Sequence, residues 1–183
     1  MIQLDTSWLQ HVQKPARYTG GEYNSIVKDH STVDVTMALA FPDVYEVAMS
    51  HLGIKILYGL VNRREDAAAE RVFAPWHDME EEMRKRNIPL FSLETRTPIK
   101  DFDVLAFTLQ YEMSFTNILN MLDLAGIPMY AKDRDMDFPL LVCGGPCAFN
   151  VEPIADFFDI VSLGESEEWG DEFIDLYKAE KAK

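Results

Sequence analysis

The sequence predicts an α/β protein with a mostly parallel sheet of five main strands and helices on both faces. Two apolar runs, at 33–41 and 103–110, are nearly continuous, as is typical of strands buried on both sides. Segments with helical spacing follow such runs, and parallel strands need crossover connections of that length. Because strand and helix patterns alternate along the chain, the expected architecture is a doubly wound sheet.

The first 32 residues are predicted to be an N-terminal arm, and residues 33–183 one domain. Turn formers, aromatic residues and charges are mixed in the arm without the period of a strand or a helix. The first strand is expected at 33–41 and ends at Pro42. The next elements along the chain are a helix at 52–62, a strand at 71–76, a charged helix at 78–87 and a short edge strand at 88–94.

The second half of the chain continues the alternation. Its predicted elements are a strand at 103–110, a helix at 114–126, a short strand at 127–131, a strand at 139–145, a short helix at 152–158, a strand at 159–165 and a helix at 167–181. The last helix is charged and has no capping signal, so the sequence fits either a small protein or a piece of a longer one.

Composition excludes several classes of protein. The chain has 183 residues, of which 48% are hydrophobic and 26% charged, an ordinary composition for one globular domain. Its 17 basic and 31 acidic residues give a net charge of -14, which disfavours general binding to nucleic acids or acidic membranes. With no signal peptide, no membrane-length apolar run and only two cysteines, we expect a soluble, cytoplasmic protein in a reducing compartment.

The residues that follow the predicted strands are the candidates for binding. In an open parallel sheet, ligands bind beyond the carboxyl ends of the strands, so these residues should meet at one edge. The candidates are Asp43, Tyr45, Glu46, His51, Gly53, Thr108, Leu109, Gln110, Tyr111, Glu112, Gly144, Gly145, Pro146, Gly164 and Glu165.

The types of these residues suit a flat or bulky ligand. Glycines let a backbone approach a ligand closely, and aromatic rings offer stacking area. Glu46 and Glu112, each beside a tyrosine, could bond a ligand's amides. The alternative is that the glycines only turn strands into helices and that the glutamates are ordinary loop carboxylates. Neither a Gly-x-x-x-x-Gly-Lys-Ser/Thr nor a Gly-x-Gly-x-x-Gly loop occurs, which disfavours a nucleotide held by a standard phosphate loop.

No catalytic or metal-binding set stands out. Ser50, His51 and Asp43 lack the Gly-x-Ser-x-Gly elbow of a hydrolase. His51 is interpreted as a helix cap or loop residue rather than a metal ligand. Cys143 and Cys147 match the first part of the Cys-x-x-x-Cys-x-x-Cys motif that holds an iron-sulfur cluster in radical S-adenosylmethionine (SAM) enzymes, but Asn150 stands at the third position. Both cysteines are therefore interpreted as packing or loop residues.

The order of the loops carries a family resemblance. Four segments resemble the N-terminal, cobalamin-binding-type domain of a family of radical SAM proteins of unknown substrate. They are FPDVYEVAMSHLGIKILY, DVLAFTLQYEMSFTNILNMLDLAGIP, LLVCGGPCAFNVEPIADFFD and IVSLGESEE. The resemblance implies a flavodoxin-like, or Rossmann-like, sheet. It also implies that a radical SAM barrel follows in cis and that the iron-sulfur cluster and SAM belong to that barrel.

The resemblance makes cobalamin, or vitamin B12, the implied cofactor of this domain. Members that bind it with the base displaced use the histidine of Asp-x-His-x-x-Gly on cobalt, and a Ser-x-Leu and a Gly-Gly make room for the dimethylbenzimidazole tail. Here Gly144 and Gly145 match the last element and Thr108-x-Gln110 only loosely matches the second. The histidine element is missing, so cobalamin would be held without a histidine ligand from this domain.

Three functions follow as hypotheses. The first is an accessory domain that positions a bulky cofactor for a radical SAM barrel and has no turnover alone. The second is a protein-docking module of the same fold in which Tyr45, Tyr111 and Phe149 fill the site. The third is a flavodoxin-type electron carrier. The sequence assigns neither the substrate nor the oligomeric state.

Overall fold

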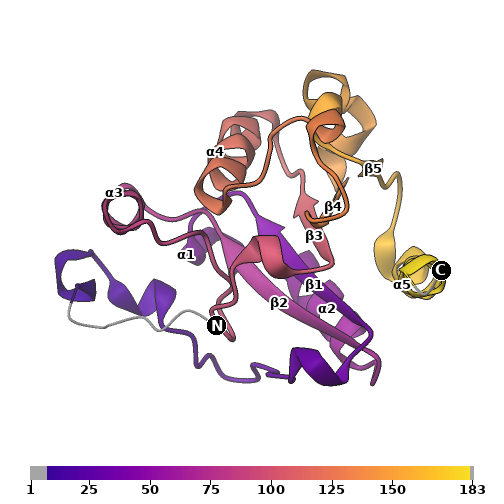
Figure 1. The fold of residues 1–183 in the computed structure, drawn as a ribbon, viewed down its shortest axis with the longest axis horizontal. Helices are drawn as coiled ribbons and strands as arrows, with labels where there is room; N and C mark the ends of the chain where they lie inside the picture. Colours follow the sequence, from indigo (N-terminus) through magenta and orange to yellow (C-terminus); the bar gives the residue numbers. More distant parts are fainter. Residues whose placement is uncertain (1–7, 182–183) are drawn as a thin grey trace.

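The computed structural model describes residues 8–181, apart from the side chain of Glu168, and its core is a parallel sheet of five strands. The strands lie in the order β2-β1-β3-β4-β5 (Figure 1). This is the strand order of flavodoxin-like, doubly wound folds, so the predicted fold class is confirmed. Every pair is parallel, and the bounds are Val35–Phe41 for β1, Ala67–Phe73 for β2, Val104–Thr108 for β3, Leu140–Gly144 for β4 and Ile160–Val161 for β5.

Helices cover both faces of the sheet because strand side chains alternate between the faces. In β1, Met37 and Leu39 pack with α2 and α5, whereas Ala38 and Ala40 pack with α3 and α4. Figure 1 shows the two pairs of helices on opposite sides of the strands. The helices are α1 Tyr45–Ala48, α2 Leu52–Asn62, α3 His77–Arg86, α4 Phe115–Ala125 and α5 Ser166–Lys181.

Five element predictions need correction. The second strand lies at 67–73 rather than 71–76, and the last strand shrinks from 159–165 to two residues. The short helix predicted at 152–158 is a 3-10 helix, Glu152–Phe157. The strands predicted at 88–94 and 127–131 do not form, although Phe91 makes an isolated bridge to Pro98.

The apolar residues of the first absent strand serve the core instead. Leu90, Phe91 and Leu93 are buried, but their segment crosses from α3 to the edge of the sheet. The main-chain N–H of Leu90 donates to Leu124 of α4, and that of Leu93 donates to Arg71 of β2. Because these bonds go to two different elements, no continuous ladder with one strand can form.

The N-terminal segment crosses the β2 side of the molecule and is bound to it by side chains. Trp8 is buried in the core under α3, and the Arg86 guanidinium lies 5.5 Å from the centre of its ring. Farther along, the main chain of Ile26 donates to the Tyr58 hydroxyl across 2.7 Å and accepts from it across 3.1 Å. Lys28 donates to the carbonyls of residues 64 and 67 at the start of β2.

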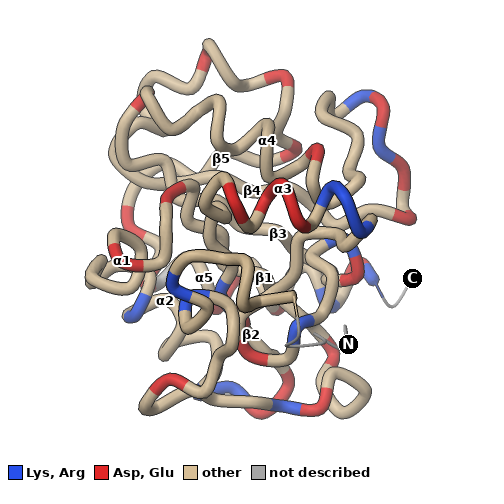
Figure 2. The backbone as a smooth tube through the Cα atoms, turned by 90° about the vertical axis from the view of Figure 1, so that its left-hand side faces the viewer, with Lys and Arg blue, Asp and Glu red and all other residues tan. Residues whose placement is uncertain are grey.

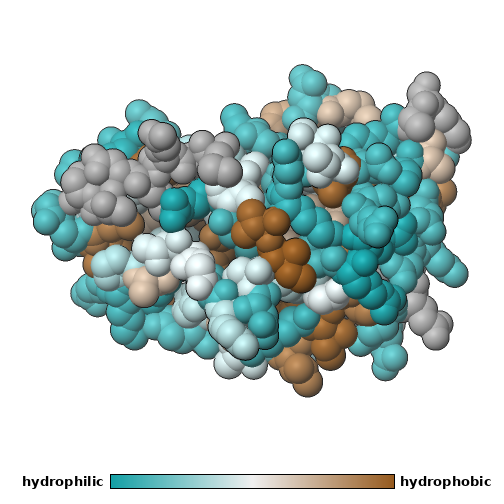
Figure 3. Space-filling view, turned by 90° about the horizontal axis from the view of Figure 1, so that it is seen from below, coloured by the Kyte–Doolittle hydropathy of each residue, from teal (hydrophilic) through white to brown (hydrophobic). Residues whose placement is uncertain are grey.

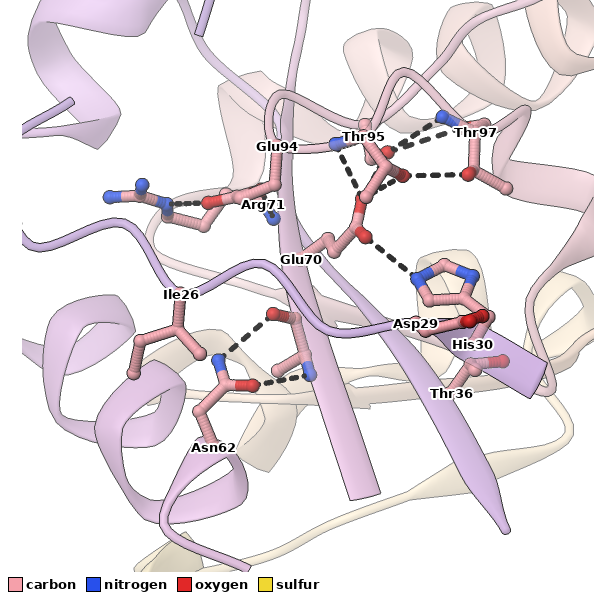
Figure 4. A network of polar contacts seen from close by, with 12 residues as sticks. Ile26, Asp29, His30, Thr36, Asn62, Glu70, Arg71, Glu94, Thr95 and Thr97 are labelled. Carbon is pink, nitrogen blue, oxygen red and sulfur yellow. Dashed lines mark hydrogen bonds and ion pairs between the residues drawn. The ribbon is translucent and has the colours of Figure 1, made fainter. Parts of the chain in front are cut away.

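A buried polar network joins this segment to β2 (Figure 4). His30 lies 2.7 Å from Glu70, which also accepts hydrogen bonds from Ser92 and Thr95. Burial alone would raise the pKa of Glu70, but these hydrogen bonds outweigh it and lower the pKa. Next along the strand, the Arg71 guanidinium pairs with Glu94 at 2.6 Å, and burial raises the pKa of the Glu94 carboxyl despite that partner.

Surface charges follow the helix dipole in α3. Acidic residues lie at its start and basic ones at its end, as Figure 2 shows. On the face drawn in Figure 3, hydrophobic residues form small patches separated by hydrophilic ones. Within residues 8–181, none of the helices combines the length and hydropathy that a bilayer-spanning segment requires.

Candidate functional site

The structure has a cavity of about 210 Å³ between one face of the sheet and the helices α2 and α5. Leu39, Ala106 and Val142 of the central strands form part of its floor, and Trp169 and Phe173 of α5 form part of one wall. The cavity extends to the ends of β1, β3, β4 and β5, at the edge predicted from the sequence, and this end of the cavity is called its mouth. Seven predicted residues line it: His51, Gly53, Thr108, Gln110, Gly144, Gly145 and Gly164.

His51 connects the start of α2 to the end of β3. Its Nδ1 accepts a hydrogen bond from the main chain of Ile54 at 3.4 Å, so the interpretation of His51 as a helix cap is confirmed. Its Nε2 lies 3.2 Å from Gln110 Oε1, and Gln110 Nε2 donates to Thr108 Oγ1 across 2.5 Å. One hydrogen-bonded chain therefore runs across the mouth of the cavity.

Two glycines make this arrangement sterically feasible. A Cβ on Gly53 would lie 2.9 Å from His51 Cε1, so a larger residue would displace the imidazole. A Cβ on Gly145 would lie 3.0 Å from the carbonyl oxygen of Leu109 and 3.3 Å from Thr108 Oγ1. Gly145 also has a φ of 106°, a conformation that favours glycine. The β4 loop thus packs directly on the end of β3.

The three candidates directly after β1, Asp43, Tyr45 and Glu46, lie outside the cavity. The Asp43 carboxylate accepts a hydrogen bond from the main-chain N–H of Val44, and the main-chain carbonyl of Asp43 accepts one from the N–H of Ala74. Tyr45 lines a separate, smaller cavity of about 30 Å³. The Glu46 carboxylate pairs with Lys14 and Arg17 of the N-terminal segment, and these bonds lower its pKa to about 2.

Five later candidates also lie outside the cavity. Leu109 is completely buried in the core on the other face, and its main chain bonds Gly144 and Cys147 at the end of β4. Tyr111 is 47% exposed and Phe149 is 76% exposed, so neither ring fills the cavity as the docking hypothesis expects. The remaining outlying candidates are Glu112, Pro146 and Glu165.

Several lining residues were missed by the sequence reasoning, above all those of α5 and of the loop before it. They include Ser162, Trp169 and Phe173. The aromatic pair is stacked, with ring centroids 4.7 Å apart. Its spacing of four residues indicates one helix face, but nothing in that spacing says which face of the sheet the helix covers.

Both cysteines are free thiols with raised pKa values. Cys143 is buried in the core, and burial raises the pKa of its thiol to about 12. Burial and then the nearby Glu112 carboxylate raise the pKa of Cys147. In the part of the chain that the structure describes, no three His, Cys, Asp or Glu side chains are grouped so that they could hold a metal ion.

Part of this sequence is similar to that of a known protein. "Uncharacterized protein MJ0966" of Methanocaldococcus jannaschii is 28% identical over 134 residues, which cover 72% of this chain and 24% of the relative. The chain thus spans about a quarter of that relative's length. The family model described as "Radical SAM proteins, N-terminal" matches residues 53–183, which hold α2, four of the strands and α5. The chain therefore belongs to the family of N-terminal domains of radical SAM proteins.

Proposed function

We propose that this chain is an accessory domain that holds a bulky cofactor of the cobalamin type at the carboxyl edge of its sheet. The cofactor would be presented to a radical SAM catalytic domain in cis. The observation that carries the proposal is the 210 Å³ cavity, which extends to the edge where four strands end and is lined mainly by apolar and aromatic side chains.

The cavity fits the flat base at the end of a cobalamin tail. An apolar cavity of roughly 150 Å³ is enough to hold a benzene ring, so the larger cavity here can accept a fused bicyclic base. The stacked rings of Trp169 and Phe173 supply aromatic surface beside it. A Cβ on Gly164 would meet nothing within 4 Å, so this glycine leaves room at the mouth for the rest of the ligand.

The hydrogen bonds of His51 support binding without a histidine ligand on cobalt. Its Nδ1 accepts from Ile54 and its Nε2 bonds Gln110, so neither ring nitrogen is left for a metal. What this chain contributes is shape: it binds and orients the cofactor and shields its base from water. When bound, cobalamin supplies methyl-transfer or radical chemistry through its cobalt, and the protein supplies its position.

The remaining parts of the proposal concern the whole protein. The iron-sulfur cluster and SAM would belong to the catalytic domain, and the chain alone is expected to show no turnover. We place the protein in the cytoplasm, because the free cysteines Cys143 and Cys147 suit a reducing compartment.

The test is a titration with hydroxocobalamin and with cobinamide, which has the same corrin but lacks the base. Binding is followed by absorbance and by co-elution in gel filtration. Hydroxocobalamin is expected to bind at least tenfold more tightly than cobinamide, because only its base can bury apolar area in the cavity. If neither compound binds at high micromolar protein, the proposal is wrong. Equal binding of both would contradict the assignment of the cavity to the base.

The electron-carrier and docking hypotheses predict different results when the same purified protein is tested. A flavodoxin-type carrier would be yellow and would bind flavin mononucleotide in preference to hydroxocobalamin. A docking module would bind neither cofactor, yet it would still bind the catalytic domain when the two are mixed.

A further inference from the structure

The chain of hydrogen bonds at the cavity mouth determines where donors and acceptors lie. The main-chain N–H of Ile54 donates to His51 Nδ1. A neutral imidazole whose Nδ1 accepts carries its proton on Nε2. His51 Nε2 therefore donates to Gln110 Oε1. The cap of α2 thus selects the tautomer of the histidine, and the histidine in turn selects the partner atom on Gln110.

This bond fixes the orientation of the Gln110 amide. With Oε1 bound to His51, the amide nitrogen turns toward β3 and donates to Thr108 Oγ1. An amide NH₂ has two N–H groups and a hydroxyl has one O–H. One N–H of Gln110 and the O–H of Thr108 therefore have no hydrogen-bond partner among residues 8–181. The mouth of the cavity offers unused donors.

Within residues 8–181, the rest of the lining adds one more free hydroxyl and no positive charge. Ser162 is only 7% exposed, and its hydroxyl also makes no hydrogen bond within the described part of the chain. No lysine or arginine among the described residues lines the cavity, whereas Glu167 does. An anionic ligand would therefore be buried beside a carboxylate without a cation, which is unfavourable.

We propose that Gln110 determines the specificity of this cavity, with His51 as its positioning residue. The cavity selects an uncharged, flat aromatic base that presents a hydrogen-bond acceptor, such as an unprotonated ring nitrogen, to Gln110 and Thr108. This inference rests on the proposed function because it concerns the same cavity. It does not require the base to be part of a cobalamin.

The test compares two probes of nearly identical shape. N-methylbenzimidazole has a ring nitrogen that accepts a hydrogen bond, and N-methylindole has a C–H at that place. Titration calorimetry on the protein is expected to show about tenfold tighter binding of the benzimidazole, since one neutral hydrogen bond contributes on this order. A benzimidazole that carries a carboxylate is expected to bind more weakly than the neutral probe.

Two substitutions separate positioning from structure. Gln110→Met keeps the length of the side chain but has no donor, and it should reduce the tenfold preference to about one. His51→Asn retains a good N-cap residue, but its short side chain cannot reach Gln110, so the preference should fall while thermal stability stays close to that of the wild type. Ser50→Ala is the control, because the Ser50 hydroxyl bonds only the Val47 carbonyl outside the cavity.

The possible results distinguish a failure of this inference from a failure of the proposed function. If the two neutral probes bind the wild type equally, the inference is wrong and an aromatic site remains. If Gln110→Met keeps the preference, or if the carboxylate probe binds as tightly as the neutral one, the inference is also wrong. If neither neutral probe binds, the cavity does not take such a base, and the proposed function fails together with the inference.

Discussion

Gly53 and Gly59 both lie in α2, but only Gly53 touches a side chain of the site. A Cβ on Gly53 would lie 2.9 Å from His51 Cε1, whereas one on Gly59 would meet nothing within 4 Å. Gly53 is therefore required by the position of the His51 side chain that caps α2, whereas no contact explains why a glycine stands at position 59. The two positions form a matched pair for experiment.

Alanine at these two positions should have different effects on stability. Gly59→Ala is expected to raise the free energy of unfolding by about 1 kcal/mol through helix propensity alone. Gly53→Ala should gain much less, because displacement of His51 removes a cap that contributes about 1 kcal/mol. Urea unfolding of both variants measures the difference, and an equal gain at the two positions would contradict the steric role of Gly53.

Arg71 is the cation of the buried network on β2, and its loss should be costly. Arg71→Met leaves the completely buried Glu94 side chain without its partner, so the free energy of unfolding should fall by about 3 kcal/mol or more. Arg63→Met, which removes an exposed ion pair with Asp171, should cost less than about 1 kcal/mol. Denaturant unfolding of the two variants under the same conditions provides the comparison.

The cost of Arg71→Met should also depend on pH. Burial raises the pKa of Glu94 above its ordinary value, so this group favours the folded state less as pH rises. Removal of Arg71 takes away an interaction that lowers that pKa, so the shift should grow. The variant should therefore lose more stability at about pH 8 than at about pH 5. A loss that is independent of pH, or larger in acid, would show that Glu94 does not titrate in this way.

The sheet's two edges are both protected against pairing with another strand. Along β2, Lys28 donates to the Ala67 carbonyl, Asn62 bonds both main-chain groups of Ala69, and Glu94 accepts from the Arg71 N–H. At the other edge, β5 has only two residues. Covered and short edges prevent the sheet from extending between molecules. Among residues 8–181, β5 thus offers a partner's strand only two residues for pairing, and β2 is covered.

Among these edge contacts, that of Asn62 is the easiest to test, because its amide bonds two buried backbone groups. Asn62→Leu keeps a similar volume but leaves the N–H and carbonyl of Ala69 without partners, which should cost about 2 kcal/mol or more. Hydrogen exchange at Ala69 should accelerate. Asn120→Leu is the control, since its side chain bonds only Glu80 and Arg84, and it should cost less than about 1 kcal/mol. Similar costs for the two variants would contradict this account.

Elements with a strong pattern were predicted well from the sequence. The strands β1, β3 and β4 are apolar runs, and α2 and α4 have clear helical spacing, so each was located to within a few residues. The start of β2 was missed because Ala67 and its neighbours have little strand propensity and are buried by the N-terminal segment. The absent strand at 88–94 shows the converse, since its apolar residues fill the core without pairing.

Across the whole molecule, the sequence predicted the edge of the sheet at which the candidate site lies, but not which face of the sheet it uses. Residues after parallel strands must meet at one edge, so His51, Gln110 and Gly145 were found together as expected. Tyr45 follows β1 as well, yet it turns toward β2 and a different cavity. The contribution of α5 depends on which face that helix covers, and packing of the whole chain decides this.

The central claim is that the cavity between the sheet and α5 is where the ligand binds. Gly170 lines that cavity, and a Cβ there would meet nothing within 4 Å, so Gly170→Phe can fill the space without strain in the helix. Gly59→Phe introduces the same ring at another unobstructed helical glycine, in α2, that does not line the cavity. Both substitutions change helix propensity equally.

The decisive measurement is the dissociation constant of hydroxocobalamin for the wild type and for these two variants. The account predicts that Gly170→Phe weakens binding at least tenfold, while Gly59→Phe binds as the wild type does. Tight binding that survives in Gly170→Phe would contradict it, because the ligand would then occupy some other part of the domain.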